Sequence, residues 1–223
     1  MRATRIVQKI LANYEGETPG VKANLCRMLM EGKLGGTGKM IILPVDQGFE
    51  HGPARSFAPN PAGYDPHYHY QLAIDAGLNA YAAPLGPLEA GADTFAGQIP
   101  TILKVNSANS LMADTAGKDQ AVTGSVADAL RLGCAAIGFT IYPGSDAQLG
   151  MFETRGLVVA WFAELPATLA GALQQENIIL VEMRADRAAG RGKAHHDVVQ
   201  PPRGQEAECG EQGAHVHVPL VDV

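Results

Sequence analysis

The sequence predicts an α/β fold built around a parallel sheet, and two observations support this prediction. Short, continuously apolar runs predict strands that are buried on both faces, at residues 40–45, 79–83, 101–105 and 135–141. Helical patterns lie between most of these runs, and such alternation is typical of parallel sheets covered by helices. Because ligands bind outside the carboxyl ends of the strands in these folds, the residues after each run are candidate site residues.

Two helices are expected before the first strand. Residues 4–14 place apolar side chains three and four positions apart, at Ile6, Val7, Ile10, Leu11 and Tyr14. Residues 21–31 repeat this pattern, which stops at Gly32. The stretch that follows, "GKLGGTGK", differs in spacing from a phosphate-binding loop and precedes a strand, so we expect a flexible connector rather than a phosphate site.

The first strand, 40–45, is expected to be fully buried, and it leads into "ILPVDQGFEHGP" at residues 42–53. This stretch holds an unusual number of ionisable groups, and a long polar loop is expected from residue 46 to residue 67 because Pro, Gly and Asn are frequent there. Residues 68–76 predict a helix closed by Gly77, and the second strand follows at 79–83.

The second half of the pattern repeats the alternation of strand and helix. A third strand at 101–105 ends at Asn106. A helix is expected over 121–132, closed by Gly133, with Val122, Val126, Ala129 and Leu130 on one face. The fourth strand, 135–141, leads into "YPGSD".

Composition and charge limit the class of protein. The chain has 223 residues, of which 46% are hydrophobic, which is ordinary for a globular protein. Its net charge of −6 argues against nucleic acid or an anionic membrane as a partner. The three cysteines, Cys26, Cys134 and Cys209, lie far apart, and neither a signal peptide nor an apolar run of about eighteen residues is found. These features predict a cytoplasmic protein with no membrane span.

Three ordered stretches resemble the archaeal-type class I fructose-bisphosphate aldolases. They are "LPVDQGFEHGPARSFAPNPAGYDPHYHYQLAIDAGLNAYAAPLG", "TILKVNSANSL" and "AAIGFTIYPGSD", and the resemblance covers residues 37–153. It implies a (β/α)₈ barrel that cleaves fructose 1,6-bisphosphate reversibly into dihydroxyacetone phosphate and glyceraldehyde 3-phosphate. It also implies a lysine that forms a Schiff base with the ketone, no metal or cofactor, and a homo-oligomer.

The resemblance implies roles for four residues. Asp46 matches the first-strand aspartate that lies against the Schiff-base lysine, and His51 matches a substrate-binding histidine at the pocket edge. Lys104 matches a pocket lysine on the fourth strand, and Tyr142 matches a fifth-strand tyrosine implicated in proton transfer. Carbon–carbon cleavage needs an electron sink and groups that move protons, and such residue types supply both.

Each of these residues also has a structural alternative. Asp46 could cap a helix, although a loop rather than a helix is expected after it, and His51 could merely brace that loop. Lys104 lies in an apolar run, where a charge is costly without a partner. Tyr142 could be a core aromatic residue. His67 and His69, spaced by two, are expected to play structural roles rather than to form a metal pair.

The resemblance stops after residue 153. Segment 1–36 is expected to be a helical extension, 37–153 the first part of a barrel, and 154–223 an aberrant or partly disordered region. Four or five strands are recognisable, so the barrel is expected to be incomplete. "NIILVEM" is a candidate strand without a lysine, and Lys193 lies in a glycine- and charge-rich stretch typical of a loop. A metal cluster is a weaker interpretation of His195, His196, Cys209, His215 and His217.

Three interpretations of function follow. The chain is a class I fructose-bisphosphate aldolase, a related aldolase acting on another sugar phosphate, or an inactive remnant that lacks the Schiff-base lysine. A truncated or frame-disrupted coding sequence near residue 153 would explain the third interpretation.

Overall fold

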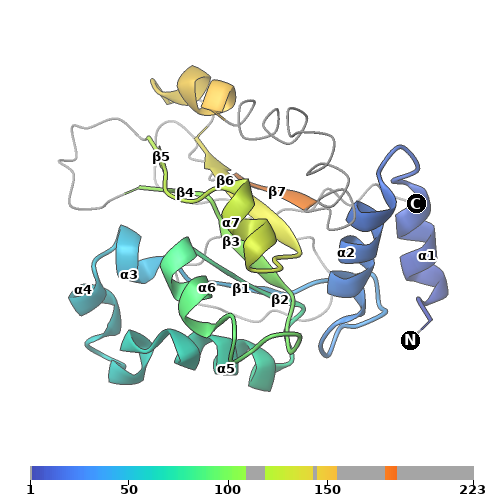
Figure 1. The fold of residues 1–223 in the computed structure, drawn as a ribbon, viewed down its shortest axis with the longest axis horizontal. Coiled ribbons are helices and arrows are strands. Elements are labelled where there is room, and N and C mark those ends of the chain that lie inside the picture. The colour runs from blue at the N-terminus through green and yellow to red at the C-terminus, as the bar shows by residue number, and fades with distance from the viewer. Residues whose placement is uncertain (1, 109–118, 143–144, 155–178, 185–223) are drawn as a thin grey trace, which may run out of the picture.

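The computed structural model describes residues 2–108, 119–142, 145–154 and 179–184. Its centre is a five-stranded parallel sheet in the order β1-β2-β3-β6-β7 (Figure 1). The five strands are β1 (Ile42–Pro44), β2 (Ala80–Ala83), β3 (Thr101–Lys104), β6 (Ala136–Ile141) and β7 (Ile179–Arg184). The predicted α/β class is therefore confirmed, and β7 includes most of the candidate strand "NIILVEM".

Helices surround this sheet. The helices are α1 (Arg5–Ala12), α2 (Pro19–Met30), α3 (Gln47–Glu50), α4 (Pro53–Phe57), α5 (Pro66–Ala76), α6 (Leu85–Gly91) and α7 (Val126–Arg131), with a 3₁₀ helix η1 at Pro61–Tyr64. Residues 148–154 are also helical. Within the described segments, no helix is long and apolar enough to cross a membrane.

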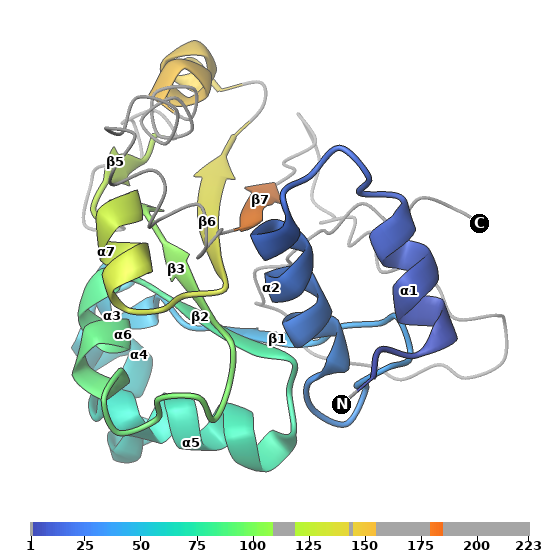
Figure 2. The same ribbon diagram turned by 45° about the vertical axis from the view of Figure 1, so that its right-hand side comes forward.

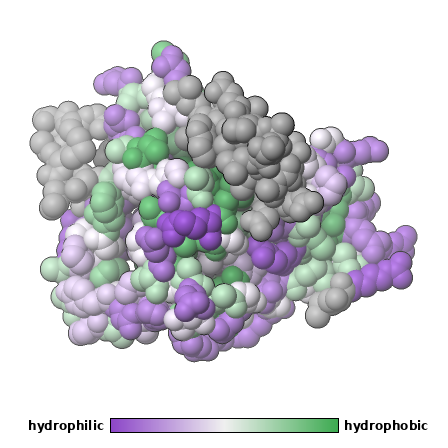
Figure 3. Space-filling view, viewed as in Figure 1, coloured by the Kyte–Doolittle hydropathy of each residue, from purple (hydrophilic) through white to green (hydrophobic). Residues whose placement is uncertain are grey.

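The two faces of the sheet pack against different helices. One face carries Tyr81, Leu103, Ile137 and Phe139 against α5, α6 and α7. The opposite face carries Ala80, Ala82, Ile102 and Ala136 against α1 and α2, which lie apart from α5–α7 in both views (Figures 1 and 2). Hydrophilic side chains cover the outer side of α1 and the lower edge near α5 on the surface seen in Figure 3.

Along this second face, the side chains of β3 and β6 change from apolar to polar between the amino and the carboxyl ends of the strands. Successive side chains of a strand alternate between faces, so Lys104 lies on the same face as Ile102, and Thr140 lies on the same face as Ala136. The pairing of Lys104 with Gly138 sets β3 and β6 in register. The second face is thus apolar near the amino ends of these strands and polar near their carboxyl ends.

The strand count corrects one implication of the resemblance. In the described sheet β3 is the third parallel strand and β6 the fourth. Lys104 therefore ends the third strand rather than the fourth, and Tyr142 follows the fourth rather than the fifth. The apolar runs place residues 101–105 third and 135–141 fourth, in agreement with the sheet, so it is the strand numbers implied by the resemblance that are one too high.

The expected loop at 46–67 is wrong in its details. The structure has three short helices there, and Pro53, Pro61 and Pro66 each stand in the first turn of a helix. Proline suits that position because its missing N–H is not needed there. The expected full burial of strand 40–45 is also wrong, since β1 is partly buried and pairs only with β2 within the described sheet.

The helix expected over 121–132 begins later, at Val126. Ala121–Val122 form β5, which pairs antiparallel with β4 (Asn106–Ser107). Ser125 caps α7 through a capping box with Asp128. The predicted closures at Gly77 and Gly133 are confirmed, and both glycines have positive φ, of 70° and 65°.

Candidate active site at the carboxyl edge of the sheet

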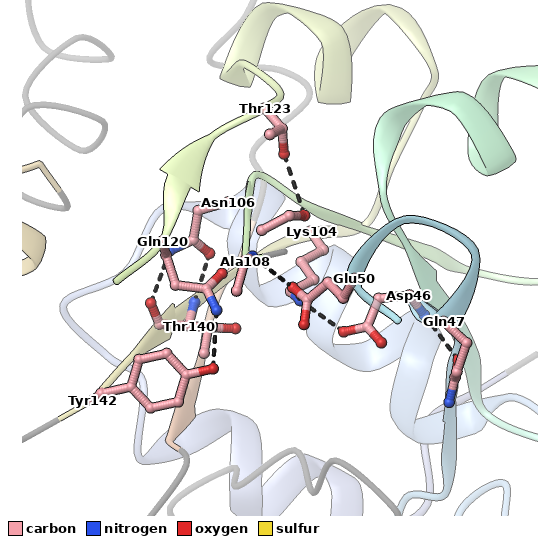
Figure 4. A network of polar contacts seen from close by, with 11 residues as sticks. Asp46, Gln47, Glu50, Lys104, Asn106, Ala108, Gln120, Thr123, Thr140 and Tyr142 are labelled. Carbon is pink, nitrogen blue, oxygen red and sulfur yellow. Dashed lines mark hydrogen bonds and ion pairs between the residues drawn. The ribbon is translucent and has the colours of Figure 1, made fainter. Parts of the chain in front are cut away.

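A buried lysine held between two carboxylates forms the centre of the site (Figure 4). Lys104 Nζ donates to Asp46 Oδ2 at 2.7 Å and also to Glu50 Oε1. The side chains of Lys104, Asp46 and Glu50 are 5%, 16% and 9% exposed. Charged groups are found buried to this degree when they are paired and hydrogen-bonded, since an unpaired buried charge would be far more costly. The sequence prediction that Lys104 needs a partner is therefore confirmed, and the partners are two acids.

Helix α3 brings the two carboxylates together. Asp46 occupies the N-cap position and Glu50 follows four residues later, a spacing that places both side chains on one side of a helical turn. The expectation that no helix follows Asp46 is wrong, but Asp46 does not cap α3 through its side chain. Its carboxylate points to Lys104 instead, so the structural alternative of a helix cap does not apply.

Glu50 is a site residue that the sequence reasoning missed. Its Oε1 atom accepts both from Lys104 and from the backbone N–H of Ala108, at 3.0 Å from the latter. The signal was present in "DQGFE", where two acids stand four residues apart. It would have been visible if that stretch had been treated as a helix rather than a loop.

His51 lies next to the two acids but is exposed. It stands at the C-cap of α3. One potential metal-ligating atom from each of Asp46, Glu50 and His51 lies within 4.8 Å of the other two. Lys104 already supplies a positive charge to both carboxylates. His51 therefore lies at the exposed edge of the carboxylate cluster, and its contact with substrate stays a prediction.

Tyr142 belongs to the same neighbourhood, on the far side of Lys104 from Asp46 (Figure 4). Its Oη atom accepts a hydrogen bond from Gln120 Nε2 at 3.0 Å. Burial raises the pKa of Tyr142, and the Gln120 hydrogen bond opposes this effect. The phenol is therefore protonated at neutral pH.

Asn106 holds the polar end of β6 in place. Its side-chain amide donates to the Thr140 carbonyl at 2.7 Å and accepts from the Thr140 N–H at 2.8 Å. This pair of bonds takes the place of pairing with β3, so β6 continues past the end of β3 as far as Ile141, next to Tyr142. Asn106 thus fixes the backbone from which Thr140 and Tyr142 project.

His67 and His69 have the structural roles that the sequence predicts. His67 Nδ1 contacts Asp65 at the surface, whereas the buried His69 ring donates from Nε2 to the Gly63 carbonyl. Lys193, His195, His196, Cys209, His215 and His217 lie outside the described residues.

Comparisons with known proteins give one family. The family model for DeoC/LacD family aldolases matches residues 40–159. A "Probable fructose-bisphosphate aldolase class 1" of Chlamydia trachomatis is 42% identical over 128 residues, which cover 57% of this chain and 36% of that protein. The class 1 fructose-bisphosphate aldolase of Thermoproteus tenax is 44% identical over 117 residues, which cover 52% of this chain and 42% of that protein. The chain thus spans less than half the length of these curated relatives.

Solved structures agree with this result. An archaeal fructose-1,6-bisphosphate aldolase, with its catalytic lysine covalently bound to the carbinolamine intermediate, superimposes with a TM-score of 0.56 at 32% identity. The match covers 70% of this chain and 56% of that chain. The predicted barrel fold is confirmed by this likeness, with the described part of the chain supplying five parallel strands.

Proposed function

Because the chain belongs to the DeoC/LacD aldolase family, we propose that it is a class I aldolase that cleaves fructose 1,6-bisphosphate through a Schiff base. The observation that supports this proposal most is the buried Lys104 between Asp46 and Glu50 at the carboxyl edge of a parallel sheet. Among the lysines that the structure describes, Lys104 is the buried one. It is also at the edge where barrels bind their substrates.

The first step of the proposed reaction is formation of the imine. One of the two carboxylates takes a proton from the Lys104 ammonium, and the neutral amine adds to the C2 ketone of the substrate. The carbinolamine then loses its hydroxyl as water, with a proton supplied by the same carboxylic acid. The product is a protonated imine, which can accept the electron pair of a breaking carbon–carbon bond.

Cleavage and release use the remaining groups. Asp46 accepts the proton of the C4 hydroxyl while the C3–C4 bond breaks and its electrons move into the imine, which becomes an enamine. The cleaved fragment leaves as glyceraldehyde 3-phosphate. Tyr142 gives its proton to the enamine carbon and recovers one from the protonated Asp46, and water then hydrolyses the imine to dihydroxyacetone phosphate and the free Lys104 amine. His51, exposed at the edge, contacts the substrate as it enters. The raised pKa of Tyr142 favours the protonated form that this role requires.

Borohydride trapping tests this proposal. Folded protein is incubated with dihydroxyacetone phosphate and borohydride, and the adduct is located by peptide mass spectrometry. We expect a mass increase on the peptide that holds Lys104, together with cleavage of fructose 1,6-bisphosphate in a coupled assay. Lys39→Met, which removes an exposed lysine, should retain both, and Lys104→Met should lose both.

A second candidate is a protein of this family that binds sugar phosphates without turnover. The specific observation in its favour is that two carboxylates share Lys104, since a protonated amine is not a nucleophile. The described strands hold no lysine besides Lys104, and the resemblance matches Lys104 to a pocket lysine rather than to the Schiff-base lysine. Binding of dihydroxyacetone phosphate without an adduct would identify this second function.

A further inference from the structure

Buried polar atoms without a partner gather around Tyr142. Within the described residues, four buried side-chain atoms have no hydrogen-bond partner, and three of them are Gln120 Oε1, Thr140 Oγ1 and Ser145 Oγ. Gln120 donates to the Tyr142 hydroxyl, Thr140 stands two residues before Tyr142, and the Ser145 N–H donates to the Tyr142 carbonyl. A buried polar atom left unpaired costs free energy, so three at one place require an explanation.

Two of these residues face the space beside Lys104. Gln120 and Thr140 are 8% and 7% exposed, and in Figure 4 both lie on the Tyr142 side of Lys104, opposite Asp46. Thr140 belongs to the polar end of the same sheet face as Lys104, as the register of β3 and β6 requires. Their free oxygens therefore belong to the candidate active site and not to the helix layer behind the sheet.

The free oxygens of Gln120 and Thr140 offer the hydrogen-bond partners that an alcohol needs. One N–H of the Gln120 amide is donated to Tyr142, and Gln120 Oε1, which has no partner, is available as a hydrogen-bond acceptor. The Thr140 hydroxyl can donate as well as accept. An alcohol has one donor and two acceptor positions, so it can donate to Gln120 and accept from Thr140 at the same time. A phosphate oxygen placed at this position would be repelled by the lone pairs of Gln120 Oε1.

We propose that Gln120 and Thr140 form a hydroxyl-recognition subsite, which binds the alcohol on the carbon next to the ketone of a sugar phosphate. This inference rests on the proposed function, because Lys104 marks where the ketone carbon lies. Gln120 has a second effect: its donation to the Tyr142 oxygen leaves the phenol hydrogen free to point toward the substrate. The subsite thus selects the substrate and orients the group that protonates it.

The preference of the subsite for an alcohol can be measured with two ligands that differ by one hydroxyl. Dihydroxyacetone phosphate carries an alcohol beside its ketone, and acetol phosphate is the same molecule without it. A site built to hydrogen-bond an alcohol rejects the analogue that lacks it, because its own polar groups are then left unpaired. We expect the wild-type chain to bind dihydroxyacetone phosphate at least about tenfold more tightly than acetol phosphate.

The test is the ratio of the two dissociation constants, measured by calorimetric titration of the full-length chain. Thr140→Val keeps the size of the side chain and removes its free oxygen, while Gln120→Met removes both the free oxygen and the N–H donated to Tyr142. In each variant the ratio of the two dissociation constants should fall to between about one and two. Thr123→Val is the matched control, because the Thr123 hydroxyl already donates to Ser107 Oγ at 3.3 Å. Its ratio should stay at the wild-type value.

Folding of the variants is checked by urea denaturation. Valine suits a strand and Thr140→Val removes an unpartnered hydroxyl, so that variant should unfold at the same or a higher urea concentration than the wild type. A ratio near one in the folded wild-type chain would overturn the subsite, as would a wild-type ratio retained by both variants. Folded wild-type protein that binds neither ligand would overturn it too.

The subsite and the proposed function can fail separately. A wild-type chain with the expected ratio but no borohydride adduct and no cleavage would refute the proposed function and leave the subsite in place. Conversely, a chain that cleaves fructose 1,6-bisphosphate while both variants keep the wild-type ratio would refute the subsite alone.

Discussion

Replacing Lys104 by methionine should destabilise the chain strongly. Methionine keeps most of the volume of the side chain, but the variant leaves Asp46 and Glu50, which are 16% and 9% exposed, without their shared cation. Removing one partner of a buried ion pair typically costs about 3–5 kcal/mol. This is a large part of the roughly 5–15 kcal/mol by which domains are stable, so the variant should lie near its unfolding threshold.

The assay is urea unfolding at pH 7, followed by circular dichroism. With a slope of about 2 kcal/mol per molar urea, the expected loss moves the midpoint down by about 2 M. Lys39→Met, at an exposed site, should stay within about 0.5 kcal/mol of the wild type.

A double variant identifies the cause. Glu50→Gln removes one of the two negative charges and keeps a carbonyl oxygen that can accept from Ala108. Lys104→Met/Glu50→Gln should therefore be more stable than Lys104→Met alone. A loss below about 1 kcal/mol for Lys104→Met, or no recovery in the double variant, would refute the argument that the two acids depend on this lysine for charge compensation.

Three further predictions concern the site and its supports. Asp46→Asn should lower cleavage by about 10²–10⁴-fold, since the proton acceptor is lost, at a stability cost of about 1 kcal/mol; unchanged turnover would remove Asp46 from the mechanism. Gly32→Ala should cost about 2 kcal/mol or more in urea unfolding, because its φ is +67° and a Cβ would collide with the backbone carbonyls that follow α5; a wild-type midpoint would contradict this packing. Ser125→Ala should cost about 1 kcal/mol at pH 7 through loss of the α7 capping box. The Ser125 hydrogen bonds lower the pKa of Asp128 from 3.8, so the part that Ser125 Oγ contributes by donating to the carboxylate is present above pH 3.8 and is lost as the pH falls through the lowered pKa. The bond from the Asp128 N–H to Ser125 Oγ does not titrate, so a smaller difference should remain; a difference between wild type and Ser125→Ala that did not shrink at all would contradict this argument.

The parallel sheet could be predicted because its signal is local and strong. Strands buried on both faces read as unbroken apolar runs, and β2, β3 and β6 fall within one residue of the expected bounds at each end. The helix that ends at Gly77 was equally visible, since a glycine with φ near 70° is a common helix stop. These elements follow from short-range chemistry that a single sequence displays.

The short helices around the site could not be predicted in the same way. Helix α3 has four residues, too few for an apolar period, and its side chains are fixed by Lys104, which lies 58 residues from Asp46 in the chain. The late start of α7 has a similar cause, because Ala121–Val122 pair with Asn106–Ser107 and so leave the helix pattern. Its true start was nevertheless readable, since Ser125 and Asp128 have the spacing of a capping box.

The register of the sheet explains why fold and site depend on each other. Lys104 pairs with Gly138, so Ile102 two residues earlier faces α2 while Lys104 ends on the same face. A slip of one residue would bury Ile102 and Lys104 on the opposite face, among the side chains that pack against α5–α7. There the lysine would meet no acid, since Asp46 and Glu50 approach from the end of β1. The ion pair therefore favours the native register as well as the site, and losing Lys104 should loosen the pairing of β3 before it affects the helices α1 and α2.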